Sequence, residues 1–218
     1  VAAVVPKGGE LPAFDTHVPL LSLPHRFGTD LSTIPSHTPY LSAPPSARGR
    51  GLARGRRVGL VWAGNPEHKN DRNRSLDEEA SRRLATGLAA LPDVTLVSLQ
   101  VGPRAADLDR LPLPAGKVER IEPLRDFADT AAEIEALDLV IGVDTSVMHL
   151  VGALARPGWL LLPFSPDWRW LLERRDSPWY PSLRLYRQRV PEDWMSVIPR
   201  IIEDLAKGTV FDRDRSSR

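Results

Sequence analysis

The chain has 218 residues, 42% of them hydrophobic, and its 29 lysines and arginines nearly balance its 28 aspartates and glutamates. This length and composition suffice for a packed core, and the near-neutral charge gives no reason to expect a nucleic acid or a membrane surface as partner. The sequence holds no cysteine, which excludes disulfides, thiolate catalysis and Cys-ligated metal centres within it. It also shows neither a membrane-length apolar run nor a signal peptide, so we expect a cytoplasmic protein without a membrane span.

Residues 1–45 are rich in proline and have only short apolar runs. Proline fixes the backbone and removes a hydrogen-bond donor, so we expect little regular structure there beyond single turns. Residues 46–57, SARGRGLARGRR, mix arginine and glycine without aromatic residues, which favours a solvated linker over a phosphate-binding stripe. The first residues, VAAVV, are typical of the inside of a strand, so one expectation, which the sequence leaves open, is that the chain is a fragment of a longer protein.

From Val58 onward, short apolar runs alternate with helical patterns. Runs bounded by turn residues predict strands at 58–62, 94–99, 118–121, 139–143, 159–162 and 183–186. Their mostly continuous apolar character favours a parallel sheet that is covered on both faces. We therefore predict an α/β, Rossmann-like, doubly wound domain over residues 58–207, followed by a disordered tail at 208–218.

Four helices are expected between and after these strands. Predicted N-caps are Ser75, which forms a capping box with Glu78, then Asp126, which is followed by Asp129, and finally Asp144. A last helix is expected over residues 191–206, where Pro199 should bend it.

The stretch LVIGVDTSVMHLVGAL, residues 139–154, runs from a buried strand directly into a helix. Parallel sheets bind ligands outside the carboxyl ends of their strands, where helix N-termini offer unpaired N–H groups. Thr145 and Ser146 add two hydroxyls beside those amides, and His149 lies one turn further, on a stripe with Thr145 and Gly152 opposite the buried side. This arrangement predicts an anion site. The alternative is an ordinary N-cap with a solvated histidine.

A second polar cluster, WAGNPEHKNDRNRS at residues 62–75, follows the first strand of the sheet. Its cations, Lys69, Arg72 and Arg74, could neutralise a diphosphate. Its asparagines, Asn65, Asn70 and Asn73, could bond hydroxyls or hold tight turns. The alternative is a long exposed loop. Neither GxGxxG nor GxxxxGK[ST] occurs, which argues against a dinucleotide oxidoreductase and a P-loop ATPase.

Three stretches carry a resemblance to a known family: VGLVWAGNPEHKNDRNRS (58–75), LVIGVDTSVMHLVGALARP (139–157) and LLLPFSPDWRWLLERRDSPWYPSLRLYRQ (160–188). They resemble the C-terminal domain of bacterial heptosyltransferase-type glycosyltransferases (glycosyltransferase family 9). More narrowly, they are similar to the transferase-like region found behind tetratricopeptide repeats. Residues 14–29, FDTHVPLLSLPHRFGT, resemble the segment just before that domain.

The resemblance implies a GT-B architecture, in which two Rossmann-like halves enclose the substrates and the C-terminal half holds a nucleotide-diphosphate sugar. It implies inverting transfer without a metal or cofactor, with residues 1–45 as the remnant of the N-terminal half. Asp144, Thr145, Ser146 and His149 match the family's Asp-Thr-small-x-x-His helix start, which holds the donor diphosphate. Lys69, with Asn70 and Arg74, corresponds to the basic loop that reaches the same phosphates.

The same resemblance places Gln100 near the nucleoside and Asp167 and Arg169, in FSPDWRW, near the sugar. Trp168 and Trp170 either stack on ligand or, as we favour, pack under the DSPWYP loop. The Asp-x-Asp pairs Asp107/Asp109 and Asp212/Asp214 are interpreted as solvated surface, so no metal site is predicted.

The catalytic base is not assigned by these motifs. His17 is the one candidate, and the alternative is a structural turn histidine. Since most of the N-terminal half is missing, the chain alone is expected to be inactive, and upstream repeats are an expected partner. A non-catalytic module that binds a nucleotide or a partner protein is the competing hypothesis. A flavodoxin-like or receiver domain is disfavoured, because a basic loop follows the first strand. The donor sugar, nucleotide base, acceptor and oligomeric state are left open.

Overall fold

The structure is a computed structural model that describes residues 3–45, 55–119 and 121–208. It divides into two units, Val1–Pro35 and Ser36–Arg218. The first unit contains only a 3-10 turn, η1 (Leu20–Ser22), and the short helix α1 (Leu23–Arg26), with mostly exposed side chains. This agrees with the proline-rich sequence. The predicted remnant at 1–45 is split, since residues 36–45 belong to the unit that contains the sheet.

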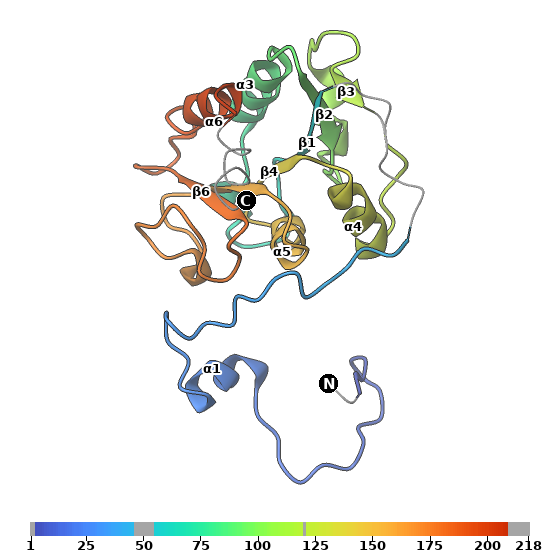
Figure 1. Cartoon of the computed structure of the whole chain (residues 1–218), viewed down its shortest axis with the longest axis vertical. Helices are drawn as coiled ribbons and strands as arrows, with labels where there is room; N and C mark the ends of the chain where they lie inside the picture. The colour runs from blue at the N-terminus through green and yellow to red at the C-terminus, as the bar shows by residue number, and fades with distance from the viewer. Residues whose placement is uncertain (1–2, 46–54, 120, 209–218) are drawn as a thin grey trace, which may run out of the picture. The chain divides into compact units, whose positions relative to one another are not determined.

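Six parallel strands form one sheet in the order β3-β2-β1-β4-β5-β6 (Figure 1). The strands are β1 (Arg56–Val61), β2 (Val94–Ser98), β3 (Val118–Glu119), β4 (Leu139–Val143), β5 (Gly158–Leu162) and β6 (Leu183–Arg187). This confirms the predicted Rossmann-like, doubly wound fold. The strand order reverses between β1 and β4, and such a switch point is where open α/β sheets bind ligands.

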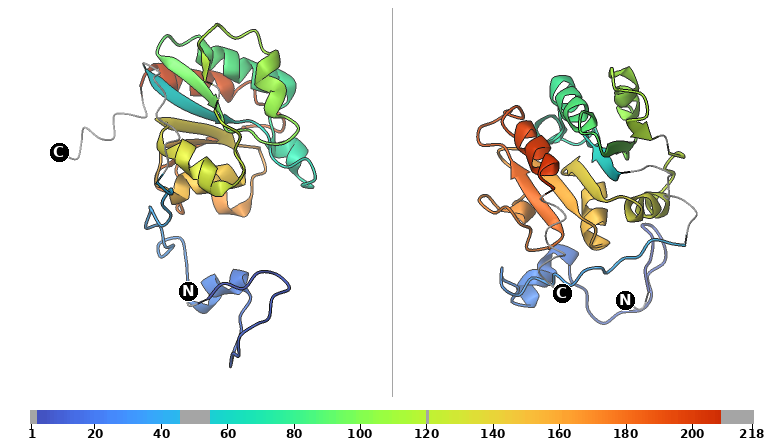
Figure 2. Two further views of the ribbon diagram at one scale, coloured as in Figure 1. Left: turned by 90° about the vertical axis from the view of Figure 1, so that its right-hand side faces the viewer. Right: turned by 45° about the horizontal axis from the view of Figure 1, so that its top comes forward.

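Helices cover both faces of the sheet (Figure 2). The remaining elements are α2 (Asp71–Arg74), α3 (Glu78–Ala89), η2 (Ala105–Arg110), α4 (Phe127–Glu135), α5 (Ser146–Ala153), η3 (Trp168–Trp170) and α6 (Ile198–Ala206). On one face α3 and α6 pack side by side, with Leu88 and Ile201 in the shared core. On the other face α4 and α5 bury Ile134 and Val151 against the sheet.

Three of the predicted helix ends are corrected. α3 is capped by Asp77, which accepts from the Ala80 N–H (2.7 Å), and Ser75 instead accepts from the Gly64 N–H (2.9 Å). The N-cap of α5 is Thr145, one residue after the predicted Asp144. α6 begins only at Ile198, so Pro199 lies in its first turn, where a missing N–H costs nothing, and does not bend it.

The cap of α4 is confirmed: the carboxylate of Asp126 accepts from the Asp129 N–H (2.8 Å). Phe127, the first residue of α4, is exposed, although an apolar side chain in an amphipathic helix is expected to be buried. The buried side of α4 is formed by Ile134 and neighbouring alanines, and Phe127 lies on its outer side.

The predicted linker ends earlier than expected, because Arg56 and Arg57 are the first residues of β1. Arg57 is buried, and its guanidinium donates to both oxygens of Glu119 (2.6 and 2.9 Å) and to the Ala136 carbonyl (2.7 Å). These bonds compensate the burial of its charge and tie β1 to β3 and to the end of α4. Residues 46–54 and 209–218, which include most of the predicted linker and tail, lie outside the described residues.

Candidate functional site

A cavity of about 610 Å³ opens at the carboxyl ends of β1, β4, β5 and β6, beside the switch point. We call it the switch-point cavity. Four segments line it: the loop after β1, the start of α5, the loop after β5 and the residues after β6. Its polar lining residues are His68, Asn70, Asn73, Arg74, Asp144, Thr145, Ser146, His149, Ser165, Asp167, Arg169, Gln188 and Glu192.

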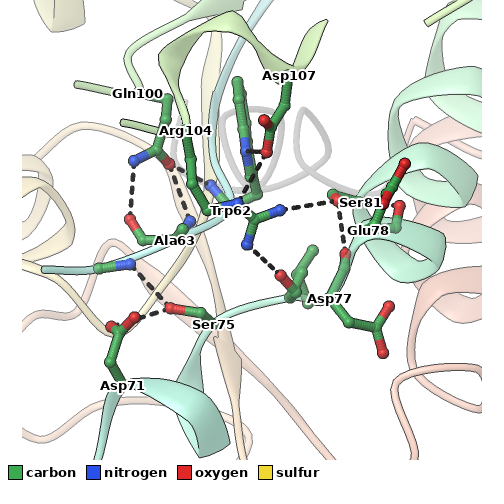
Figure 3. Close-up of polar contacts among 12 residues, drawn as sticks. Trp62, Ala63, Asp71, Ser75, Asp77, Glu78, Ser81, Gln100, Arg104 and Asp107 are labelled. Atoms are coloured by element: carbon green, nitrogen blue, oxygen red, sulfur yellow. Dashed lines mark hydrogen bonds and ion pairs between the residues drawn. The ribbon is translucent and has the colours of Figure 1, made fainter. Parts of the chain in front are cut away.

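Gln100 holds the first of these segments in place. Its side-chain oxygen accepts from the N–H groups of Trp62 (3.0 Å) and Ala63 (2.9 Å), and its amide nitrogen donates to the Ala63 carbonyl (3.0 Å) (Figure 3). The same nitrogen also donates to the Val101 carbonyl (3.0 Å). A carboxamide offers two donors and two acceptor sites, so all four are used. The structure therefore gives Gln100 the role of positioning the loop. Gln100 also lines a cavity beside this loop, and its place near the nucleoside stays a prediction.

A second tie lies beside it. Asp107 accepts from the indole N–H of Trp62 (3.1 Å) and from Arg104 (2.8 Å), and Arg104 also donates to the Leu76 carbonyl (Figure 3). Asp107 is thus a partly buried structural carboxylate, not the solvated one expected. Its predicted counterpart, the pair Asp212/Asp214, lies outside the described residues.

The polar loop folds by means of its asparagines. The Asn65 side chain accepts from the Glu67 N–H (3.0 Å), and the Asn73 amide donates to the Asn70 side chain (2.7 Å). These bonds confirm the turn-holding role that was one of two expected for the asparagines. The turn runs into α2. Residues two apart on a helix point in nearly opposite directions, so Arg72 and Arg74 face different sides.

As a result, the loop delivers fewer cations to the cavity than predicted. Arg74 and Asn70 line it, whereas Lys69 is exposed and does not. Arg72 is 90% exposed and lies 3.7 Å from Glu192, an exposed pair that contributes little.

Arg74 crosses the switch point. Its Nε donates to Asp71 (3.1 Å) and its Nη1 to the backbone oxygen of Asp144 (3.0 Å). The side chain is 16% exposed. A Cβ at Gly64 would lie 2.3 Å from Arg74 Nη2, so only glycine lets the guanidinium lie this close to the backbone. Among the described residues Nη2 has no protein acceptor, and it is available to a ligand.

The start of α5 presents hydrogen-bond donors. The Thr145 carbonyl accepts from Met148 (3.0 Å), while the N–H groups of Ser146 and Val147 open the helix and have no intrahelical partner. The Thr145 hydroxyl is buried and, within the part of the chain that the structure describes, bonds to nothing. The positive end of the helix dipole favours an anion here.

His149 lies one turn into α5, and its side chain is 35% exposed. Its ring stacks on Trp170 with centroids 5.2 Å apart, its Nδ1 is 3.2 Å from the Tyr180 hydroxyl and its Nε2 is 3.8 Å from Asp144. Burial lowers the pKa of His149, partly opposed by the charge of Asp144. The ring is therefore neutral at pH 7. The stripe of Thr145, His149 and Gly152, predicted to lie opposite the buried side of α5, is itself covered by these aromatic rings.

Asp167 and Arg169 both line the cavity, from the loop after β5. Asp167 accepts from the Arg169 N–H (3.0 Å) and from its guanidinium (2.7 Å), which fixes the loop. Trp170 is fully buried, which confirms the packing role favoured for it, whereas Trp168 is 60% exposed. The Arg169 guanidinium lies 4.9 Å from the Trp168 ring centroid.

Tyr180 and Gln188 were not predicted as site residues. Tyr180 contacts His149, and Gln188, which follows β6, accepts a hydrogen bond from the Phe164 N–H through its side-chain oxygen (3.0 Å). The carboxyl-end rule, applied to the sixth strand, would have found Gln188. No sequence pattern near Tyr180 indicates its role, because its partner His149 lies 31 residues earlier in the chain.

His17 lies in the first unit, exposed and edge-on to Phe14 with ring centroids 6.1 Å apart. Its role as a base stays a prediction. No cluster of three potential metal ligands occurs among the described residues, and no helix within them has both the length and the apolarity to cross a membrane.

Comparison with known proteins gives a fold but not a family. No family model matches the chain. It is 28% identical to Protein FlbA of Caulobacter vibrioides over 159 residues, which is 69% of this chain and 25% of FlbA. The structure of E. coli heptosyltransferase WaaC with ADP matches with a TM-score of 0.52 and 20% identity over 71% of this chain and 46% of that one. WaaC with ADP-2-deoxy-2-fluoro heptose matches with a TM-score of 0.49 and 18% identity, over 71% and 45%.

The chain thus spans about a quarter of FlbA and less than half of WaaC. At 20% identity the likeness to WaaC concerns the fold alone. The domain has the Rossmann-like fold of one half of a GT-B glycosyltransferase.

Proposed function

We propose that this domain is the donor-binding half of a glycosyltransferase and that the switch-point cavity holds the diphosphate of a nucleotide sugar. The observation that carries the proposal is the contact of Arg74 with the Asp144 carbonyl, which brings a guanidinium next to the start of α5. A diphosphate there would accept from Arg74 Nη2, the Ser146 and Val147 N–H groups and the Thr145 hydroxyl. Hydrogen bonds to a charged group contribute about 1.5–3 kcal/mol each.

A second cavity, of about 460 Å³, lies on the other side of the same residues and shares Arg74, Thr145 and Ser146 with the first. Two lobes that meet at a phosphate site match the shape of a nucleotide sugar. The second lobe, with Pro66, Val101 and Pro103 in its lining, suits a nucleoside. The first, with Asp167 and Gln188, suits sugar hydroxyls.

The chemistry we propose is a single inverting displacement. The acceptor hydroxyl oxygen bonds to the anomeric carbon as the bond from that carbon to the diphosphate oxygen breaks, and the hydroxyl proton passes to a general base. Negative charge grows on the leaving diphosphate, and Arg74 with the N-terminus of α5 stabilises it from a fixed position, so that the protein supplies the charge a metal would otherwise provide. When the Tyr180 hydroxyl donates to Nδ1 of His149, the ring proton lies on Nε2. Nε2 then donates a hydrogen bond to the bound nucleotide sugar.

The activity of the whole protein is a further proposal, because the chain spans about a quarter of FlbA and less than half of WaaC. We keep His17 as the candidate base, a cytoplasmic location and upstream tetratricopeptide repeats as parts of that proposal. Lys69 is kept only as a more distant cation at the rim, given its exposure.

The test is the affinity of Thr145→Val for nucleoside diphosphates, measured by calorimetry with EDTA present. In the free protein the hydroxyl has no described partner, so its loss should leave stability unchanged, while affinity falls about tenfold. Thr130→Val is the matched control: it removes a bond to the Asp126 carbonyl (2.9 Å) on α4 and should lower stability without changing affinity.

If the parent chain binds no nucleoside diphosphate, the proposed function is wrong. Binding without sugar transfer by the complete protein would instead favour a non-catalytic nucleotide-binding module.

A further inference from the structure

A third cavity, of about 520 Å³, lies along β6, which is the edge strand of the sheet (Figure 1). We call it the β6 groove. Its lining is dominated by arginine and contains a single carboxylate. The charged residues are Glu173, Arg174, Arg175, Arg187, Arg189 and Arg200.

Most of this positive charge is not neutralised. Arg174 pairs with Asp176, which lies beside the groove. Arg175, Arg187, Arg189 and Arg200 form no ion pair with any carboxylate in the described ranges. The pKa of Arg200 is lowered by burial and then by the positive charges of Arg189 and Arg175, so these guanidinium groups repel one another. Uncompensated like charges around a concave surface favour the binding of an anion.

Two buried donors at the groove also lack a partner. Arg187 donates through Nη2 to the Trp170 carbonyl (3.0 Å), but its Nη1 is buried and unbonded within the described chain. Gln188 is 2% exposed, and its Nε2 is likewise unbonded there. The orientation of this amide follows from its oxygen, which accepts from the Phe164 N–H. Buried donors are nearly always satisfied, so two of them in one groove indicate an acceptor from outside the chain, either water or a bound anion.

The geometry points to the β6 groove as a binding site for a phosphate monoester. A dianion with three terminal oxygens can accept from several guanidinium forks and from the Gln188 amide at once, which a single carboxylate cannot. This proposal for a phosphate site does not depend on the proposed function of the switch-point cavity.

The position of the groove suggests which substrate carries this phosphate. Gln188, Phe164 and Ser165 line both the groove and the switch-point cavity. A ligand with its phosphate in the groove therefore reaches the place proposed for the donor sugar. This second step rests on the proposed function and makes the ligand a phosphorylated acceptor.

The test is titration of the chain with inorganic phosphate, with a hexose 6-phosphate and with the neutral hexose, followed by NMR of the Gln188 amide and arginine side chains. The test variant is Arg175→Gln/Arg189→Gln, both exposed positions. The control is Arg83→Gln/Arg110→Gln, also exposed, which makes the same change in net charge away from the groove. We expect phosphate affinity to fall at least about tenfold in the test variant and to stay within about twofold in the control.

Equal binding of both phosphates indicates a site that reads the phosphate alone, and tighter binding of the hexose phosphate indicates an acceptor. Equal losses in the two double variants, or no phosphate binding by the parent chain, would overturn the site. The titration repeated on Thr145→Val separates the two proposals, because that change should weaken nucleoside diphosphates only. Phosphate binding without nucleotide binding would leave this site standing and the proposed function refuted.

Discussion

The guanidinium of Arg74 donates a 3.0 Å hydrogen bond to the backbone oxygen of Asp144 and so joins the loop after β1 to the start of α5. These segments leave adjacent strands on the two sides of the point where the strand order reverses. One side chain thus fixes the width of the cleft at the switch point and places its positive charge beside the N-terminus of a helix. The site depends on a contact between parts of the chain 70 residues apart.

The first prediction concerns this contact. Arg74→Gln removes bonds to Asp71 and to the Asp144 carbonyl, so we expect a loss of about 1–3 kcal/mol in the free energy of unfolding and at least a tenfold loss of nucleotide affinity. Arg72→Gln, two residues away and 90% exposed, should change stability by less than about 0.5 kcal/mol. Denaturant unfolding and calorimetry measure both quantities. Equal effects of the two changes would show that only net charge matters.

The second prediction concerns pH. Burial lowers the pKa of His149 from its usual 6.5, so the folded state binds a proton less readily than the unfolded chain. Neutral His149 therefore contributes fully to the free energy of unfolding above pH 6.5. This contribution is lost as the pH falls from 6.5 to the folded-state pKa, and the free energy of unfolding changes by at most about 1.4 kcal/mol per pH unit. His149→Gln should flatten the curve in this window. Unfolding free energies of the parent and variant, measured from pH 7.5 to 4.5, decide it; parallel curves would contradict the prediction.

The strands could be predicted because parallel strands, buried on both faces, appear in sequence as apolar runs. All six predicted runs became strands, with ends that differ by at most two residues. The rule that ligands bind at the carboxyl ends of strands led to Thr145 and Ser146, whereas the family resemblance led to Asp167. The exposure of Lys69 could not be predicted, because the side that a loop residue faces depends on the turns around it, here set by Asn65 and Asn70.

The parts that were missed depend on contacts that are distant in sequence. A glutamine at position 100 looks the same in the sequence whether its side chain binds a ligand or the backbone. Its bonds to the backbone depend on where the fold places Trp62 and Ala63. In the same way, the burial of His149 depends on Trp170 and Tyr180, which follow it by 21 and 31 residues.

Gln100 gives the third prediction. In Gln100→Leu the buried N–H groups of Trp62 and Ala63 lose their acceptor, and each unsatisfied buried group costs about 1–3 kcal/mol. Stability should fall by about 2–5 kcal/mol, while the order of preference among ADP, UDP and GDP, measured below the unfolding temperature, should not change. If Gln100→Leu is stable but changes the preference among these nucleotides, Gln100 contacts the nucleoside.

Arg57 gives the fourth prediction and tests where the domain begins. Arg57→Gln removes a two-pronged, largely buried pair with Glu119, so we expect a loss of about 3 kcal/mol. Arg82→Gln removes an exposed pair with Glu79 on α3 and should cost much less stability, because solvent screens exposed ion pairs. Both are measured by urea unfolding. If the two losses match, the arginines at 56 and 57 behave as linker after all.

The last prediction concerns the face of α5 behind His149. A Cβ at Gly152 would lie 2.3 Å from Cγ of Tyr180, a distance that side chains do not tolerate, so Gly152→Ala must push the tyrosine ring away. Because overpacking of this kind costs about 1–3 kcal/mol, we expect a loss in that range. The shift should also break the 3.2 Å contact between Tyr180 and Nδ1 of His149 and weaken nucleotide binding.

A double-mutant cycle identifies the cause. If the clash with the ring is what matters, Gly152→Ala should cost much less in a Tyr180→Ala background, since the atoms it would meet are gone. The coupling between the two changes should then be at least about 1 kcal/mol in unfolding free energy. Additive losses would mean that the alanine acts through the helix backbone instead. In that case the orientation of His149 would have to come from its stacking on Trp170, and Tyr180→Phe should leave nucleotide affinity unchanged.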